Sequence, residues 1–313
     1  LSSLLLAYFS WRYIENPFRS KTRVSRRSVF KYSMIFIFLY SVTGIWLNQT
    51  NGALAYFPSE KQAVFKSFIN PSDYVINMHQ QIRLKEFSKT KHKKNILIIG
   101  DSHSEDLVNA VFEAGLNSEI EFSSFYIHIR CGVLFVADKA DREDTNPIYN
   151  CQSDIGSFSN NDLQVQMSLA DEIWIVSSWQ QSDIPYMVES LENIKIINKE
   201  IKLFGAKRFG TVSAQWYNLT EIDNWDSALF RDGDASSYAI VKKINDDLEK
   251  IANSVDVEFI NTQHLIFEEN DFCSNYIDGN IISYDGSHLT KHGANILGES
   301  LKSALNKLNT AED

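Results

Sequence analysis

The chain has 313 residues, of which 44% are hydrophobic and 12% aromatic. This size and composition allow one large core with an appendage and argue against two large domains. The formal net charge is −10, yet residues 1–50 hold seven basic residues against one acidic residue, so the remaining 263 residues carry −16. An acidic body of this kind excludes nucleic acid as the expected partner.

A basic cluster precedes a long apolar run near the N-terminus. The chain begins without methionine on an apolar segment at 1–9, so we expect it to be the C-terminal part of a longer protein. Residues 29–47 are long and apolar enough to cross a bilayer, and the positive-inside rule then places everything after residue 47 outside. A buried helix of a soluble protein is the alternative, because four small or polar residues dilute the run; a cleaved signal peptide fits poorly.

After a polar, partly helical connector at 48–94, strand-like and helix-like segments alternate. Short apolar runs rich in β-branched and aromatic residues predict strands at 95–99, 120–129, 172–177, 208–213 and 257–261. Helical periodicity predicts helices at 105–114, 163–170, 185–204, 238–252 and 292–308. The alternation indicates an α/β protein with a mostly parallel sheet, helices on both faces, and functional groups at the carboxyl ends of the strands.

The first predicted strand ends in Gly100-Asp101-Ser102, which delivers a serine to the start of the next helix. There the free N–H groups and the positive end of the helix dipole can stabilise developing negative charge, so Ser102 is the expected nucleophile. A helix cap is the structural alternative, because Ser102 with Glu105 also fits a capping box. The turn alone does not decide between these roles.

A second motif, Asp285-Gly-Ser-His288, lies far along the chain before the last predicted helix. Its aspartate and histidine are about one helical turn apart, so the carboxylate can fix the imidazole tautomer while the other ring nitrogen faces the serine. His288 is therefore the expected base and Asp285 its orienting acid. His103, next to the serine, is expected to support the turn.

The chain has three cysteines, too few for a disulfide scaffold, but outside the cytoplasm two of them are expected to pair. Cys131 and Cys151 flank a loop-like stretch at 138–150, and we predict this pair, whose closure would contribute about 3 kcal/mol. Three free buried thiols are the alternative, and the state of Cys273 stays open. No Cys-x-x-Cys pair occurs, so no metal site is expected.

The two motifs resemble those of a known superfamily. Gly100-Asp101-Ser102 after a first strand, and Asp285-x-x-His288 before a last helix, are similar to the blocks of SGNH/GDSL esterases and acyltransferases. Each block alone is weak, but their order, separation and flanking elements make the pair specific. The resemblance implies a flavodoxin-like three-layer α/β/α sandwich, with the SGNH catalytic domain at 95–313.

A second resemblance lies at 10–19, where the chain reads Ser-Trp-Arg-Tyr-Ile-Glu-Asn-Pro-Phe-Arg. It is similar to the closing signature of the membrane acyltransferase-3 family, some members of which continue into a transmembrane helix and a periplasmic SGNH domain. This layout implies the end of the membrane module and a basic cytoplasmic loop at 1–28, a transmembrane helix at 29–47 and a periplasmic linker at 48–94. The chain most resembles bacterial lipopolysaccharide O-antigen O-acetyltransferases of this fused type.

These resemblances imply an acetyl relay at the bacterial inner membrane. The chain's own membrane module would take acetyl from cytoplasmic acetyl-CoA, and the periplasmic domain, which binds no cofactor itself, would hand it to a glycan acceptor. Ser102 would carry the acetyl group, His288 would act as base and then acid, and Asp285 would orient it. The expected partners are the membrane module, the lipid bilayer and a glycan, with lipopolysaccharide O-antigen as the first choice.

The sequence departs from the superfamily pattern in the oxyanion hole. Relatives use a glycine from a second block and an asparagine from a Gly-x-Asn-Asp block. Gly132 is the candidate glycine, although turn geometry alone also explains it. Ser177-Ser178-Trp179 stands where the asparagine block is expected, so the third donor is Ser178, a backbone N–H, or absent.

Three aromatic residues follow predicted strands and are candidates for stacking on sugars, although core packing is the stronger expectation for each: Trp179, Trp216 and Tyr217. Three functions stay open. The first is a carbohydrate O-acetyltransferase, the second a carbohydrate O-acetyl esterase, and the third a catalytically silent glycan-positioning module. The intact Ser102, Asp285 and His288 argue against the third, and the acyltransferase-3 signature argues against the second.

Overall fold

The structure of the chain is a computed structural model that describes residues 2–16, 25–69, 71–88, 93–136, 157–198, 200–210, 217, 232–267 and 275–311. It divides into two compact units, Leu1–Pro58 and Ser59–Asp313. Three residues singled out in the sequence lie outside the described residues: Cys151, Trp216 and Cys273.

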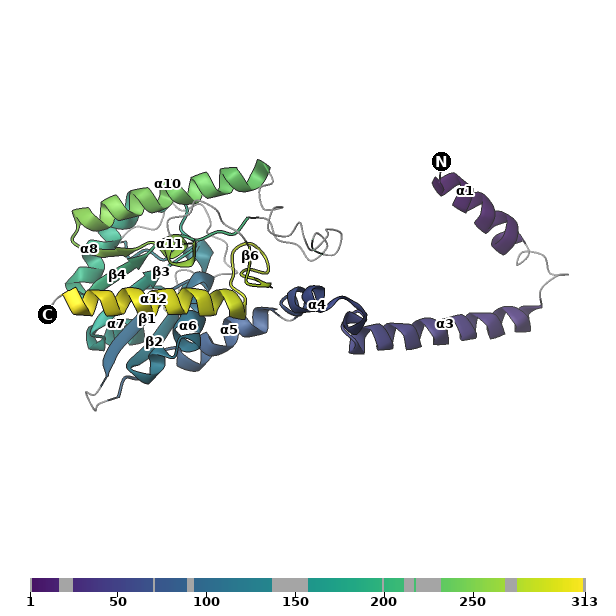
Figure 1. Cartoon of the computed structure of the whole chain (residues 1–313), viewed down its shortest axis with the longest axis horizontal. Coiled ribbons are helices and arrows are strands. Elements are labelled where there is room, and N and C mark those ends of the chain that lie inside the picture. The colour runs from purple at the N-terminus through teal and green to yellow at the C-terminus, as the bar shows by residue number, and fades with distance from the viewer. Residues whose placement is uncertain are drawn as a thin grey trace. The chain divides into compact units, whose positions relative to one another are not determined.

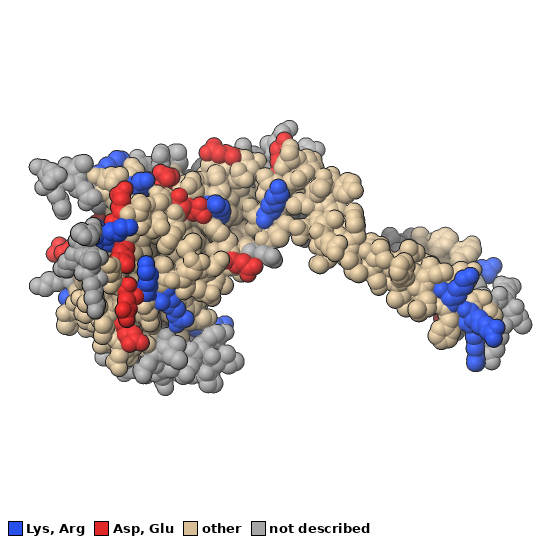
Figure 2. All heavy atoms as spheres, turned by 90° about the horizontal axis from the view of Figure 1, so that it is seen from below, with Lys and Arg blue, Asp and Glu red and all other residues tan. Residues whose placement is uncertain are grey.

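The N-terminal unit is helical, with α1 at Ser2–Phe9, a π-helical turn η1 at Ser10–Glu15, α3 at Arg26–Gln49 and a 3-10 turn η2 at Leu54–Tyr56. The hydroxyl of Ser25 caps α3 by accepting a hydrogen bond from Ser28 N–H. The 24 residues of α3 span about 36 Å, and none of them is buried. The helix is long and apolar enough to cross a membrane and contains the predicted apolar run. Figure 2 shows its uncharged length and the Lys and Arg side chains gathered where it begins.

The second unit is built on a five-stranded parallel sheet. Its strands are β1 (Lys94–Gly100), β2 (Ile120–Tyr126), β3 (Glu172–Val176), β4 (Ile201–Phe204) and β5 (Glu258–Ile260), in the order β2-β1-β3-β4-β5. β1 is an inner, mostly apolar strand, and its Ile98 lies between Ser124 of β2 and Trp174 of β3. The predicted parallel α/β architecture is therefore confirmed.

Helices cover both faces of the sheet because successive strand residues point to opposite sides. In β1, Ile96 and Ile98 belong to one apolar core, and Leu97 and Ile99 belong to the other. The first core includes α5 (Pro71–Ile82), α6 (Ser102–Glu113), α11 (Thr262–Phe267) and α12 (Lys291–Ala311); the second includes α7 (Asn161–Leu169), α8 (Met187–Ile197) and α10 (Asp232–Ser254). Figure 1 shows the resulting three layers.

Short elements complete the unit: α4 (Ser59–Lys66), the 3-10 turns η3 (Leu116–Ser118), η4 (Ile129–Cys131) and η6 (Ile184–Tyr186), and an antiparallel hairpin of β6 (Tyr276–Ile277) and β7 (Asn280–Ile281). α4 and α5 lie within the segment predicted as a linker at 48–94, yet they belong to the same compact unit as the sheet. α5 is fixed to α6, because Asn109 Nδ2 donates to the carbonyl oxygens of Tyr74 and Val75.

The prediction was wrong between residues 185 and 210. A single helix was expected at 185–204, but α8 ends at Ile197 and β4 follows. Asn198 ends the helix, because its backbone is extended and its side-chain amide donates to the carbonyl oxygens of Met167 and Ala170. The strand expected at 208–213 is a loop over its described residues 208–210, and the remaining residues lie outside the described part of the chain. The helix and the strand are both apolar and only a few residues apart, so together they resemble one long segment of helical periodicity.

The strand order reverses between β1 and β3, because β2 lies on one side of β1 and the later strands lie on the other. In parallel sheets of this order, the segments that leave the carboxyl ends of the two strands at the reversal face one crevice. The segment after β1 holds Asp101 and Ser102, and the segment after β3 holds Ser177 and Ser178. The fold therefore brings these four residues to one place.

Candidate active site

Ser102 is the first residue of α6 and follows β1 through a tight turn. The turn requires glycine at position 100, because a Cβ there would lie 1.9 Å from the carbonyl oxygen of Val176 in β3. Asp101 is the N-cap of α6 and accepts a hydrogen bond from His103 N–H at 2.9 Å. The alternative role of Ser102 as a capping residue is therefore wrong, because its neighbour takes that role and leaves Ser102 at the first helical position.

Asp101 also connects the two strands at the reversal. Its Oδ2 atom accepts hydrogen bonds from the Ser177 hydroxyl at 2.8 Å and from Ser178 N–H at 2.9 Å. The side chain is completely buried, and burial raises the pKa of Asp101 although these hydrogen bonds favour its ionised form. The turn that presents Ser102 is thus fixed to the end of β3 by one carboxylate.

Asp285 and His288 form the predicted pair. Asp285 Oδ2 lies 2.6 Å from His288 Nδ1, and Asp285 Oδ1 accepts hydrogen bonds from the backbone N–H groups of Ser287 and His288. Together these contacts close a tight turn in which the carboxylate fixes the orientation of the imidazole. The Nε2 atom of the ring is then the one left to exchange protons with a substrate or a nucleophile.

The pair shifts both of its pKa values. Burial would raise the pKa of Asp285, but the hydrogen bonds from His288 and Ser287 lower it to about 2. Burial would lower the pKa of His288, but the hydrogen bond to Asp285 and the charge of Asp106 raise it above its usual range. The ring of Tyr284 stacks on the imidazole, with centroids 5.9 Å apart. His288 is therefore a stronger base than an exposed histidine.

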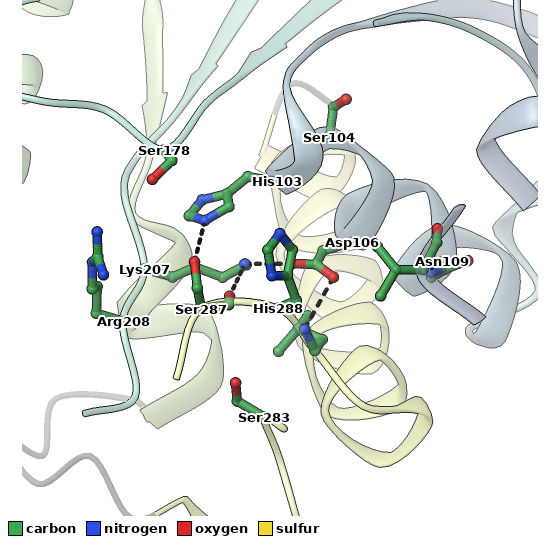
Figure 3. Close-up of polar contacts among 12 residues, drawn as sticks. His103, Ser104, Asp106, Asn109, Ser178, Lys207, Arg208, Ser283, Ser287 and His288 are labelled. Carbon is green, nitrogen blue, oxygen red and sulfur yellow. Dashed lines mark hydrogen bonds and ion pairs between the residues drawn. The ribbon is translucent and has the colours of Figure 1, made fainter. Parts of the chain in front are cut away.

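The start of α6 lies beside the Asp285–His288 turn. His103 Nε2 is 2.9 Å from Ser287 Oγ, and the rings of His103 and His288 have centroids 6.0 Å apart (Figure 3). Burial lowers the pKa of His103 well below its usual range, so this ring is a neutral support of the turn, as expected from the sequence. Within the described part of the chain, the Ser102 hydroxyl makes no hydrogen bond, to His288 or to any other group.

The two predicted oxyanion residues use their backbone N–H groups elsewhere. Gly132 has a positive φ of 67° and ends η4, and its N–H donates to the carbonyl oxygen of Ile129 at 3.2 Å. Ser178 N–H donates to Asp101. The Ser178 hydroxyl and the N–H of Ser102, which opens α6, make no hydrogen bond among the described residues. The role of Gly132 and Ser178 as oxyanion donors stays a prediction, and for Ser178 the side chain is the available group.

The aromatic candidates that the structure describes are core residues. Trp179 is buried and donates from Nε1 to the carbonyl oxygen of Phe204 at 2.7 Å, and Tyr217 is buried with its hydroxyl bonded by Asn275 Nδ2 at 3.2 Å. Neither ring is free to stack on a sugar. Cys131 is buried and disulfide-bonded. Because Cys151 lies outside the described residues, its pairing with Cys131 stays a prediction.

Sequence reasoning missed three charged residues that surround His288. Asp106 and Lys207 form a buried ion pair with Nζ and Oδ2 2.5 Å apart, and burial raises the pKa of Glu105 to about 7. A signal for the first two existed: Asp106 is four residues after Ser102 on the same helix, and Lys207 interrupts an apolar stretch just after a strand. No local pattern, however, joins residues 101 positions apart. No group of described residues has the composition of a metal site.

The assembled groups have the chemistry of acyl transfer. A half-buried hydroxyl at a helix N-terminus, a histidine oriented by a carboxylate, and an unused N–H at the start of the same helix can provide nucleophile, base and oxyanion donor. The arrangement needs no metal ion for this chemistry. It also offers a second, supporting histidine that stays neutral.

Comparisons with known proteins give a family and a fold for the chain. A family model described as the SGNH domain fused to AT3 domains matches residues 76–303. No curated protein sequence matches the chain. Among solved structures, the periplasmic domain of a lipopolysaccharide acetyltransferase from Salmonella ser. Paratyphi A is similar over 77% of this chain and 98% of that chain, with 16% identity and a TM-score of 0.54.

Two esterases are more distant. The aryl esterase of M. smegmatis is 13% identical over 69% of this chain and 100% of that chain, with a TM-score of 0.37. An acetyl-xylooligosaccharide esterase from Geobacillus is 13% identical over 68% of this chain and 94% of that chain, with a TM-score of 0.35. At these identities the likeness to the Salmonella domain shows a shared fold.

Proposed function

Because the chain belongs to the SGNH domain family of the type fused to AT3 domains, we propose that it transfers acetyl groups to hydroxyls of a surface polysaccharide through an acetyl-Ser102 intermediate. The observation that carries the proposal is the Asp285–His288 pair, 2.6 Å apart, beside the start of the helix that presents Ser102. Lipopolysaccharide O-antigen is the proposed acceptor, because the similar Salmonella domain belongs to a lipopolysaccharide acetyltransferase.

The reaction has two halves. In the first, Ser102 Oγ attacks the carbonyl carbon of the acetyl donor while His288 takes the hydroxyl proton, and the donor leaves with that proton. In the second, a sugar hydroxyl attacks acetyl-Ser102 and gives its proton to His288, which returns it to Ser102 Oγ as the ester breaks. Asp285 keeps the imidazole oriented in both halves and stabilises its protonated form.

Developing negative charge on the carbonyl oxygen needs donors that the folded chain already holds in place. The N–H of Ser102 and the hydroxyl of Ser178 are the groups we assign to this task, with Gly132 as a third donor once its contact with Ile129 opens. The Ser102 N–H and the Ser178 hydroxyl donate to no other acceptor among the described residues.

The acetyl donor is proposed to come from the membrane module to which domains of this type are fused. That module would take acetyl from cytoplasmic acetyl-CoA and pass it to the periplasmic side. α3 supports this topology, because it is long, apolar and unburied, and basic residues lie at its beginning (Figure 2). We therefore propose that α3 crosses the inner membrane and that the second unit works in the periplasm.

The direct test is mass analysis of the full-length protein, reconstituted in membranes and supplied with acetyl-CoA. We expect the mass increase of one acetyl group on the peptide that contains Ser102, and none in the Ser102→Ala variant. The exposed Ser118, beyond the far end of α6, provides the matched control, because Ser118→Ala should keep the acetylated peptide. Acetyl found on the peptide of Ser287 instead would contradict the assignment of the nucleophile.

A cell-based measurement separates the alternatives. In cells carrying Ser102→Ala, loss of polysaccharide acetylation supports the transferase, while excess acetylation would identify an esterase. Unchanged acetylation would identify a domain that only positions the glycan.

A further inference from the structure

The turn that carries His288 is tied to α6 by the buried ion pair of Asp106 and Lys207, whose side chains are 0% and 2% exposed. Asp106 Oδ1 accepts a hydrogen bond from Leu289 N–H at 3.0 Å, and Lys207 Nζ donates to the carbonyl oxygen of Ser287 at 2.7 Å (Figure 3). The carboxylate of Asp106 therefore holds both neighbours of His288: it binds Leu289 directly and Ser287 through Lys207.

The same carboxylate is rigidly related to the nucleophile. Asp106 stands four residues after Ser102 on α6, about one helical turn away on the same side of the helix. Loss of the contacts of Asp106 would therefore allow the His288 turn to move relative to Ser102. The turn also contacts the start of α6 and the segment after β4, through His103 with Ser287 Oγ and through Phe209 N–H with the carbonyl oxygen of Gly286, and each of these is a hydrogen bond between neutral groups.

From this geometry we infer that Asp106 and Lys207 are positioning residues, which hold His288 in register with Ser102 for acyl transfer. The inference rests on the proposed function of Ser102. Stability alone is a weak reason for such a pair, because the cost of burying two charges cancels most of their attraction and apolar side chains of similar size often replace them without loss. What the apolar replacement would not provide is a polar contact on each side of His288.

The pair also acts on the charge of the imidazole. Charged and titratable groups face His288 from three segments. α6 contributes His103, Glu105 and Asp106, and the turn itself contributes Tyr284 and Asp285. The loop after β4 contributes Lys207, and also Arg208, which acts on His103. Asp106 raises the pKa of His288, and Lys207 lowers it by less. Loss of the pair should therefore lower the pKa of His288 as well as loosen its turn.

The experiment uses the full chain in detergent with 15N-labelled histidine, and the variants Asp106→Asn and Asp106→Asn with Lys207→Met. The double variant removes both charges, so that a buried charge is not left alone, and it keeps an oxygen for Leu289 N–H. NMR titration of the imidazole nitrogens should give a lower pKa for His288 in both variants. Acetylation of Ser102 by 4-nitrophenyl acetate should slow roughly 100-fold in the double variant, as expected for a misplaced base.

A second lysine on the same segment of chain provides the control for loss of a charge pair. Lys202 in β4 is partly buried and pairs with the more exposed Glu258 at the opposite end of the sheet, so Lys202→Met with Glu258→Gln also removes one lysine–carboxylate pair. This control should leave the pKa of His288 and the acetylation of Ser102 as in the parent. An unchanged pKa or an unchanged acetylation rate in the Asp106–Lys207 variants overturns the positioning role. A parent chain that never acetylates Ser102 overturns the proposed function instead, and the titration still decides whether the pair acts on His288.

Discussion

Charged side chains lie at both ends of the parallel sheet, but they make different kinds of contact at the two ends. At the amino ends of the strands, Glu172 receives Lys94 from β1, Lys202 from β4 and the indole N–H of Trp174, and Lys202 also pairs with Glu258 of β5. The ion pairs join side chains across neighbouring strands, and the Trp174 contact lies within β3. They reinforce a sheet whose hydrogen bonds already fix the same residues.

At the carboxyl ends, each carboxylate accepts from the backbone of an irregular segment. Asp101 accepts from Ser178 N–H, Asp106 from Leu289 N–H, and Asp285 from His288 N–H. The N–H groups of turns lack the regular backbone hydrogen bonds of a sheet, so these carboxylates serve as their acceptors. Charged side chains at the amino end therefore contribute mainly to stability, and those at the carboxyl end fix the geometry of a site.

The largest effect is expected for Asp285→Asn, because an amide cannot stabilise the protonated imidazole and can select the wrong tautomer. We expect a loss of roughly 10³- to 10⁴-fold in the rate of Ser102 acetylation. The carboxylate that raises the pKa of His288 is removed while burial still lowers it, so the rising limb of the pH–rate profile should move to lower pH. Stopped-flow measurement with 4-nitrophenyl acetate between pH 5 and 9 gives both quantities.

The exposed Asp278, in the β6–β7 turn, is the matched control for loss of a carboxylate. Its φ of 48° suits asparagine, so Asp278→Asn should fold and react like the parent. A comparable loss in both variants would mean that net charge, and not the orientation of His288, sets the rate.

The second effect concerns stability at the two ends. Asp101→Ala leaves three donors without an acceptor and removes the cap of α6, so we expect the free energy of unfolding to fall by roughly 3 kcal/mol. Glu258→Ala at the amino end removes a half-exposed partner of Lys202 and should cost about 1 kcal/mol or less. Urea denaturation followed by circular dichroism measures both values. Equal losses would erase the distinction between the two ends.

The smallest effect is expected for Glu105→Gln. The pKa of Glu105 is about 7, above its ordinary 4.5, because the side chain is buried beside Asp106. The folded chain therefore keeps a proton that the unfolded chain releases, so the parent loses stability as the pH rises from about 4.5 to about 7. Glutamine stays neutral, and the variant should become the more stable protein, by roughly 1 kcal/mol, above pH 7.

The exposed Glu119 serves as the control for this measurement. Glu119→Gln should change the free energy of unfolding by little at any pH in this window. A Glu105→Gln difference that does not vary with pH would show that the carboxyl of Glu105 is not buried as described.

Local sequence patterns predicted much of the fold. Four of the five strands of the parallel sheet were predicted, because β-branched runs such as 95–99 and 172–177 are separated by polar turns. The fourth strand, Ile201–Phe204, was missed because it is short and follows an apolar helix almost directly. For Trp179, core packing was the stronger expectation and is confirmed, but its partner could not be predicted, because Phe204 arrives from another strand.

What the amino-acid order determined by itself is the chemistry that neighbours can express: a serine at the start of a helix, an aspartate three residues before a histidine, and an apolar run with basic residues before it. Which of these groups meet, and which contacts hold them, depends on how the whole chain packs. Asp106 reaches Lys207 and Leu289 because the sheet brings α6, the loop after β4 and the last turn together. Such pairs arise from packing between segments far apart in the chain, and no short stretch of sequence contains the information that selects them.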